Sequence, residues 1–176
     1  MSIRVSSGLF KSRRLECPVK GVRPTTDKVK EAIFSSLAFE IKDAYILDLF
    51  AGSGNLGIEA LSRGAKHATF VDSLAHSSRC IQINLSSLDI LENATIIRSD
   101  ALSFIRQCTA TFDLIFMDPP YNKGLASKMV PHVYNLLKIG GIVAIEHSPD
   151  EIIDMQPWKT RIYGDTMITY IKRDES

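Results

Sequence analysis

The chain has 176 residues, 45% hydrophobic and 23% charged, which fits one globular domain with a substantial core. We see no secretory signal and no apolar run of the roughly 20 residues that cross a bilayer, so we expect a soluble, cytoplasmic monomer without a membrane partner. The cysteines Cys17, Cys80 and Cys108 fit neither a disulfide framework nor a zinc cluster, and we expect no metal.

The net charge of +1 hides a basic beginning, because residues 1–30 hold eight basic and two acidic side chains. This asymmetry is typical of an arm that contacts phosphates, although a solvated charged face explains it about as well. We take residues 1–22 as a basic arm and 23–176 as the main domain. The candidate phosphate contacts are Arg4, Lys11, Arg13, Arg14 and Arg23.

The first elements in chain order are two short strands, expected at 3–6 and 13–17, that form an N-terminal hairpin. Pro24 then breaks the chain, and Thr25 or Thr26 can cap a helix. An apolar stripe recurs every four residues along this helix and is expected to cover the main sheet. The stripe consists of Val29, Ile33 and Leu37.

From residue 44 onward, buried strands alternate with helices, a pattern typical of parallel strands joined by helical crossovers. Strands are expected at 45–50, 67–71, 94–98, 112–117 and 141–146, and helices at 56–61, 75–88, 101–107 and 124–138. Two further strands, 158–163 and 166–172, surround Gly164-Asp165 and predict an antiparallel hairpin with Trp158 and Tyr163 in the core. The fold class is therefore α/β, with a mostly parallel, seven-stranded, Rossmann-like sheet and helices on both faces.

A glycine-containing turn follows the first strand of this series, in the segment Asp48-Leu49-Phe50-Ala51-Gly52-Ser53-Gly54. Gly52, Gly54 and Gly57 fit G-x-G-x-x-G, and Asp72 ends the next strand, where it can accept the two hydroxyls of a ribose. NAD and S-adenosylmethionine both satisfy this pattern. An acidic residue at the start favours S-adenosylmethionine, because an ammonium or sulfonium attracts a carboxylate and a pyrophosphate does not.

The candidate cofactor-binding residues are Asp48, Phe50, Ala51, Gly52, Ser53, Gly54, Asp72, Ser73, Asp100 and Ala101. Asp100 follows the strand at 94–98, although capping of the next helix explains it about as well.

A stiff turn, Asp118-Pro119-Pro120-Tyr121, follows the fourth strand of the series. Two prolines cannot continue a sheet, so the turn lies at the carboxyl edge, where open α/β sheets bind ligands. The Asp118 carboxylate and the Pro119 carbonyl could hold both N–H bonds of an aromatic amine, and Tyr121 offers a ring on which a base can stack. Glu146 and His147 end another strand at this edge, where a minor contact with the substrate is an alternative that we do not adopt, and we assign neither a role.

Three stretches together resemble the bacterial 16S ribosomal RNA guanine-N2 methyltransferases of the RsmD type. They are Arg23 to Phe34, Leu47 to Ala65, and Asp118-Pro119-Pro120-Tyr121 with Gly124. The resemblance covers nearly the whole chain and implies a class I methyltransferase fold, with catalysis by the turn at 118–121. It implies S-adenosylmethionine as cofactor, S-adenosylhomocysteine as product, Asp48 near the methionine end and Asp100 at the adenine amino group.

The resemblance also implies methylation of the 2-amino group of one guanine in 16S ribosomal RNA, within the small subunit or a late assembly intermediate. It places Thr25 and Thr26 near substrate or cofactor. The family's arm is richer in glycine than the stretch Lys11-Ser12-Arg13-Arg14 found here. Four alternatives stay open: an adenine-N6 methyltransferase of DNA or RNA, a protein glutamine methyltransferase, an NAD-dependent oxidoreductase, and an RNA-binding module without activity.

Overall fold

The computed structural model describes residues 3–16, 25–120 and 124–175. The strands are β1 (Ile3–Arg4), β2 (Arg14–Leu15), β3 (Tyr45–Leu49), β4 (His67–Asp72), β5 (Ala94–Arg98), β6 (Phe112–Met117), β7 (Leu137–His147), β8 (Lys159–Tyr163) and β9 (Thr166–Lys172). The helices are α1 (Asp27–Ser36), α2 (Asn55–Ser62), α3 (Ala75–Ser87), α4 (Ala101–Gln107) and α5 (Leu125–Tyr134), with a 3₁₀ turn at Leu91–Asn93. None of the helices in these ranges is long and apolar enough to cross a membrane.

Seven strands form one sheet in the order β5-β4-β3-β6-β7-β9-β8. The first five of these are parallel, and β9 runs antiparallel to both β7 and β8. Strands β1 and β2 pair separately as a small antiparallel hairpin. The expected Rossmann-like methyltransferase architecture, with its terminal antiparallel hairpin and its basic N-terminal hairpin, is confirmed.

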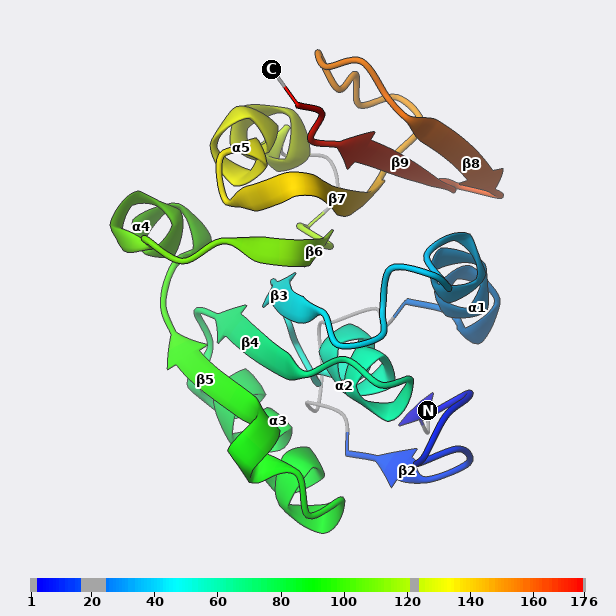
Figure 1. Cartoon of the computed structure of the whole chain (residues 1–176), viewed down its shortest axis with the longest axis vertical. Helices are drawn as coiled ribbons and strands as arrows, with labels where there is room; N and C mark the ends of the chain where they lie inside the picture. Colours follow the sequence, from blue (N-terminus) through cyan, green and yellow to red (C-terminus); the bar gives the residue numbers. More distant parts are fainter. Residues whose placement is uncertain (1–2, 17–24, 121–123, 176) are drawn as a thin grey trace.

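Helices cover both faces of the sheet, as predicted (Figure 1). Side chains alternate between the faces along each strand, so Ile46 of β3 packs with α1, α2 and α3, while Leu47 packs with α4 and α5. Two hydrophobic cores result, one on each side. The face under α1 and α2 also receives Ile3, Val5 and Leu15 of the small hairpin.

The sheet has a topological switch point between β3 and β6. The chain first runs outward from β3 to β4 and β5, then returns to place β6 on the other side of β3. Crossovers that leave in opposite directions open a crevice at the carboxyl ends of the two strands, and such crevices bind ligands. Both motifs found in the sequence follow these two strands.

Helix α1 begins as the sequence predicted, with Thr26 as its cap: the Thr26 hydroxyl accepts a hydrogen bond from the Val29 amide at 3.3 Å. The stripe of Val29, Ile33 and Leu37 is buried against the sheet. Phe34 adds an aromatic contact with Phe116 of β6, at 5.4 Å between ring centroids. This packing brings the start of α1 to the carboxyl edge.

The small hairpin is tied to α2 by the buried carboxylate of Glu59. It accepts hydrogen bonds from the Ser6 amide and hydroxyl, both at 2.8 Å, and from the Ser7 amide at 3.0 Å. Lys30 of α1 and Arg63 neutralise it at 3.2 and 2.9 Å. Burial opposes ionisation, yet these hydrogen bonds and positive charges hold the pKa of Glu59 below its usual range.

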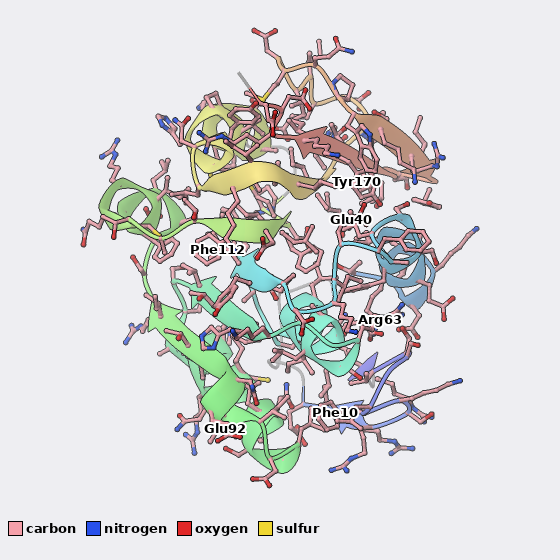
Figure 2. The ribbon with its side chains drawn as sticks, viewed as in Figure 1. Phe10, Glu40, Arg63, Glu92, Phe112 and Tyr170 are labelled. Atoms are coloured by element: carbon pink, nitrogen blue, oxygen red, sulfur yellow. The ribbon has the colours of Figure 1, made fainter. Side chains whose placement is uncertain are left out.

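Two neighbours complete this anchor. Lys30 also donates to the backbone carbonyl of Arg4, and Arg63 stacks on Phe34 at 4.8 Å from the ring centroid. Figure 2 shows Arg63 beside α1 and α2, with Phe10 on the hairpin below. Gly8 lets the hairpin approach α2 closely, because a Cβ there would lie 2.0 Å from the Ser62 carbonyl oxygen.

Two predictions about the last third of the chain were wrong. The helix expected to reach residue 138 ends at Tyr134, and β7 starts at Leu137. The reason is that Leu137 pairs with Phe112 of β6. A bulge at Gly140 and Gly141 then shifts the register of the two strands. Trp158 was expected in the core, but it is 47% exposed and meets the buried Tyr170 in an edge-to-face contact, at 6.5 Å between ring centroids.

Replacing Glu59 with alanine tests the anchor. Glu59→Ala leaves the Lys30 ammonium buried without its carboxylate, so we expect a loss of about 3–5 kcal/mol in the free energy of unfolding, measured by urea denaturation at pH 7. The control is Glu31→Ala on the exposed side of α1, which should change this free energy by about 0.5 kcal/mol or less. If the free energy of unfolding of Glu59→Ala falls no further than that of Glu31→Ala, the charged cluster around Glu59 does not stabilise the fold.

Candidate active site

The glycine-containing turn after β3 has an unusual backbone. Phe50, Gly52 and Gly54 all have positive φ, at 60°, 56° and 79°. The turn closes on itself through a 2.7 Å hydrogen bond from the Gly54 amide to the Ala51 carbonyl. Phe50 is not a glycine, so its left-handed conformation stores strain of the kind that gathers at functional sites.

A second layer of side chains fixes this turn. The Ser53 carbonyl accepts from Asn84 Nδ2 at 2.9 Å, and Asn84 is buried on α3. Asp72, at the end of β4, accepts from the Gly52 amide at 2.9 Å and from the Leu74 amide at 2.9 Å. The predicted acidic residue therefore lies directly against the turn. Asn84 was not singled out in the sequence, because nothing near it in the chain marks it.

Asp48 lies buried beneath the turn. Its Oδ2 accepts from the Gly57 amide at 2.8 Å. Only glycine fits at position 57, since a Cβ would lie 2.3 Å from a ring carbon of Phe70 and 3.1 Å from Asp48 Oδ2. Burial, with a smaller contribution from the charge of Asp72, raises the pKa of Asp48 to about 8 against the effect of the Gly57 hydrogen bond.

The remaining predicted cofactor residues flank the turn on the side of β4 and β5. Asp100 caps α4, where its Oδ1 accepts from the Ser103 amide at 3.0 Å. Ala101 starts α4 and is buried, while Ser73 is exposed after β4. The capping role of Asp100 is thus present in the structure, and a ligand contact by its second oxygen stays a prediction.

The corner after β6 brings together three side chains from distant parts of the chain. The Thr25 hydroxyl lies 3.3 Å from Asp118 Oδ2 and 3.0 Å from Glu146 Oε2. Pro119 is buried and Pro120 exposed. Tyr121 and Arg23 lie outside the described residues. Glu146 is the site residue that the sequence analysis left without a role; its position one residue before the end of β7 was the available signal.

The carboxylates of Asp48 on β3, Asp118 directly after β6 and Glu146 on β7 lie along three adjacent strands on the same face of the sheet. Their strands pair in register, with Asp48 opposite Phe116 and Phe116 opposite Ala144. Burial first, then the charges of Glu146 and Asp48, raise the pKa of Asp118 well above its usual range, although the Thr25 hydrogen bond opposes this. These three carboxyl groups together favour binding of a cationic ligand. When no such ligand is bound, they retain protons more readily than exposed carboxyl groups do.

The predicted phosphate contacts gather elsewhere, on the small hairpin. Arg4 and Arg14 lie on β1 and β2 and are exposed, as are Lys11 and Arg13 between them. Arg13 Nη2 donates to the Ser87 carbonyl at 2.8 Å, which ties it to the end of α3. Thr26 caps α1 and is exposed, whereas Thr25 joins the corner. Within the described ranges, no three His, Cys, Asp or Glu side chains are grouped to hold a metal ion.

Comparison with known proteins adds independent findings. The sequence model of the family described as Conserved hypothetical protein 95 matches residues 3–172. The chain is 41% identical to "Ribosomal RNA small subunit methyltransferase D" of Escherichia coli K12 over 145 residues, 82% of this chain and 71% of the relative. It is 36% identical to the Haemophilus influenzae protein of the same name over 165 residues, 89% of this chain and 84% of the relative.

Solved structures agree with this. The Escherichia coli chain named yhhF has a TM-score of 0.90 and 32% identity, with all of both chains covered. An RNA methyltransferase from Salinibacter ruber, solved with S-adenosyl-L-homocysteine, has a TM-score of 0.72 over 88% of this chain and 95% of that one. Its identity is 12%, so this second likeness shows the fold alone.

The raised pKa of Asp48 predicts a pH-dependent stability. Because the folded pKa of about 8 exceeds the ordinary value of 3.8, the folded state holds a proton that the unfolded state releases. The free energy of unfolding of the ligand-free protein should therefore fall as pH rises towards 8, by at most about 1.4 kcal/mol per pH unit. Asp48→Asn keeps an acceptor for the Gly57 amide and should remove this slope.

The measurement is urea unfolding of both proteins between pH 6 and 9. The stability difference between Asp48→Asn and wild type should grow in favour of the variant up to about pH 8 and then level off. Asp150→Asn, at an exposed carboxylate, is the control and should follow wild type. Parallel curves for wild type and Asp48→Asn would mean that Asp48 is ionised in the folded protein throughout.

Proposed function

The chain belongs to the Conserved hypothetical protein 95 family, the RsmD type of methyltransferase, and from that premise we propose that it methylates the 2-amino group of a guanine in 16S ribosomal RNA. The observation that carries the proposal is the Asp118 corner, which adjoins the glycine turn across the switch point. Methylation of small-subunit ribosomal RNA is the activity that the relatives' names print. The guanine and its 2-amino group are the finer part of the proposal.

The residues around the turn fit S-adenosylmethionine. A buried carboxylate with a raised pKa, Asp48, lies under a turn whose glycines leave room for close approach of a ligand. Each carboxyl oxygen of Asp72 accepts one hydrogen bond from a backbone amide, that of Gly52 or that of Leu74. A remaining lone pair on each oxygen can accept a hydrogen bond from a ribose hydroxyl. Asp100 is proposed to accept a hydrogen bond from the adenine amino group through the oxygen that does not cap α4. The cofactor, when bound, supplies a methyl group already activated by its positive sulfur, so no metal is needed.

The protein's part in the reaction is to hold the amine. An aromatic amine is a weak nucleophile because its lone pair is delocalised into the ring. Acceptors at Asp118 and at the Pro119 carbonyl would turn both N–H bonds away, so that the lone pair points at the methyl carbon from about 3–3.5 Å. Tyr121, from the same turn, is proposed to stack on the base.

A proton must leave the amine when the new N–C bond forms. Asp118 is the nearest carboxylate to receive it, and Thr25 connects Asp118 to Glu146. In the free protein, burial and the neighbouring carboxylates raise the pKa of Asp118, which favours its protonated form. A positive charge at the sulfur and ammonium lowers that pKa, because it favours the ionised carboxyl. Binding of the cofactor would therefore prepare the acceptor of the proton.

The test is transfer of radiolabelled methyl groups to small subunits that lack this modification, followed by mass spectrometry of the RNA digests. Wild type should yield one N2-methylguanosine. Asp118→Ala should lower transfer by at least about 100-fold, because it removes the acceptor of the amine, while calorimetry should find cofactor binding within about threefold of wild type. Methylated adenine in the digest, or wild-type turnover by Asp118→Ala, would overturn the assignment.

The basic hairpin is proposed to contact phosphates of the RNA. Removing two exposed charges, in Lys11→Ala with Arg14→Ala, should reduce the slope of log affinity against log salt by about two, measured with small subunits between 50 and 200 mM salt. Arg13 is kept, since it also bonds to α3. The matched control removes two charges from the opposite face, Arg106 and Lys128, and should leave the slope unchanged. Equal slopes in both variants would exclude the hairpin from the interface.

A further inference from the structure

Glu146 stands beside Asp118 at the catalytic corner. Strands β6 and β7 are parallel and pair Met117 with Ile145, so the next residues, Asp118 and Glu146, follow side by side. Both lie on the face covered by α1, since Phe116 and Ala144, two positions earlier, belong to the core on that side. Glu146 is 8% exposed. Glu146 therefore adds a second acidic group to the corner, and its charge contributes to the raised pKa of Asp118.

The Thr25 hydroxyl shows how the pair is arranged. It lies within hydrogen-bonding distance of both carboxyl groups, but it has one hydrogen to donate. Both contacts are hydrogen bonds only if one carboxyl is protonated and donates to Thr25, while Thr25 donates to the other. Each carboxyl group keeps further lone pairs besides the one that faces Thr25, so Asp118 and Glu146 can present acceptors side by side at the corner.

Two adjacent acceptors require two adjacent donors on the base. Among the standard bases that carry an exocyclic amine, only guanine has them on its Watson–Crick edge. The Watson–Crick edge of guanine carries N1–H next to the 2-amino group, so two donors point the same way. Adenine presents its 6-amino donor beside N1, which is an acceptor, and cytosine presents its 4-amino donor beside N3, another acceptor. A carboxylate facing either ring nitrogen would leave two acceptors opposed, which costs binding energy.

We propose that Glu146 accepts the N1–H of the target guanine while Asp118 holds its 2-amino group, so that Glu146 selects guanine among the bases. This rests on the proposed guanine-N2 activity and adds the residue that recognises the base. The same hydrogen bond has a chemical effect: drawing N1–H towards a negative charge increases electron density on the ring and on the 2-amino nitrogen. Glu146 therefore both selects the base and strengthens its nucleophile.

Replacement of Glu146 by glutamine separates this role from a structural one. Glu146→Gln keeps the shape and an oxygen for the Thr25 hydroxyl, but it adds an amide that can donate. The matching substrate is 2-aminopurine, which retains the 2-amino group and has an N1 without hydrogen. Small subunits are reconstituted on 16S ribosomal RNA that carries guanine or 2-aminopurine at the methylated position, and kcat/KM is measured for each.

Wild type should prefer guanine by at least about 100-fold, because the analogue leaves a buried acceptor unpaired. Glu146→Gln should lower kcat on guanine and reduce the preference at least about tenfold, towards or past equality. Asp118→Asn is the control, since loss of the carboxylate that receives the amine's proton should slow both substrates alike and leave the preference unchanged. Thermal unfolding and cofactor binding by calorimetry establish that each variant is folded.

Three outcomes are distinguishable. Transfer to guanine with a collapsed preference in Glu146→Gln supports the inference. Transfer to guanine with the wild-type preference intact in Glu146→Gln overturns the role of Glu146 and leaves the proposed function standing. A wild-type protein that methylates no guanine 2-amino group overturns the proposed function and this inference together.

Discussion

Three carboxylates at the carboxyl edge of adjacent strands, Asp48, Asp118 and Glu146, impose the main constraint on this fold. They share one face of the sheet, and burial raises the pKa of both Asp48 and Asp118, with the charge of Asp72 adding to it at Asp48 and the charges of Glu146 and Asp48 adding to it at Asp118. The ligand-free protein therefore keeps protons that an ordinary surface carboxyl would lose. A cation placed among them reverses the penalty, so the arrangement is destabilising alone and favourable with a positive ligand.

Contacts from several elements hold the glycine turn beside these carboxylates in one conformation. Asn84 and Asp72 fix the glycine turn from two different elements, and the absence of a side chain at Gly57 lets Phe70 and Asp48 pack beneath it. Strain at Phe50 is held by the same contacts. A turn held this firmly loses little further freedom when a ligand binds, which is the energetic advantage of preorganisation.

The sequence predicted the parts of the structure that local pattern determines. Alternating buried strands and helices, the glycine turn and the two prolines each carry their signal within a few residues, and the parallel direction of the strands followed from the rules of crossover connections. Contacts between distant residues carry no such signal. Thr25 meets Asp118 across 93 positions, and Ser6 meets Glu59 across 53. Glu146 was visible at the end of a strand, but its partner on the neighbouring strand appears only when the register is known.

The end of α5 shows the opposite failure, in which local pattern misled. Apolar residues continue beyond Tyr134, so the helical period seemed to persist to residue 138. Pairing of Leu137 with Phe112 won instead, because the edge of β6 offers hydrogen bonds to a strand and the Phe112 amide already donates to the Leu136 carbonyl at 2.8 Å. Strand pairing therefore ends the helix about one turn earlier than the local pattern predicted.

Helix α1 joins the basic hairpin to the corner after β6. Its entry places Thr25 between Asp118 and Glu146, and one turn further Lys30 reaches the buried carboxylate of Glu59 and the backbone of Arg4 on the basic hairpin. The hairpin and the corner after β6 are thus both attached to one helix of 10 residues. A displacement of the hairpin must act on this helix, and the buried Lys30 and Glu59 pair resists it, since separating those charges costs free energy in a buried site. The position of the Thr25 hydroxyl at the corner is linked through α1 to that buried ion pair.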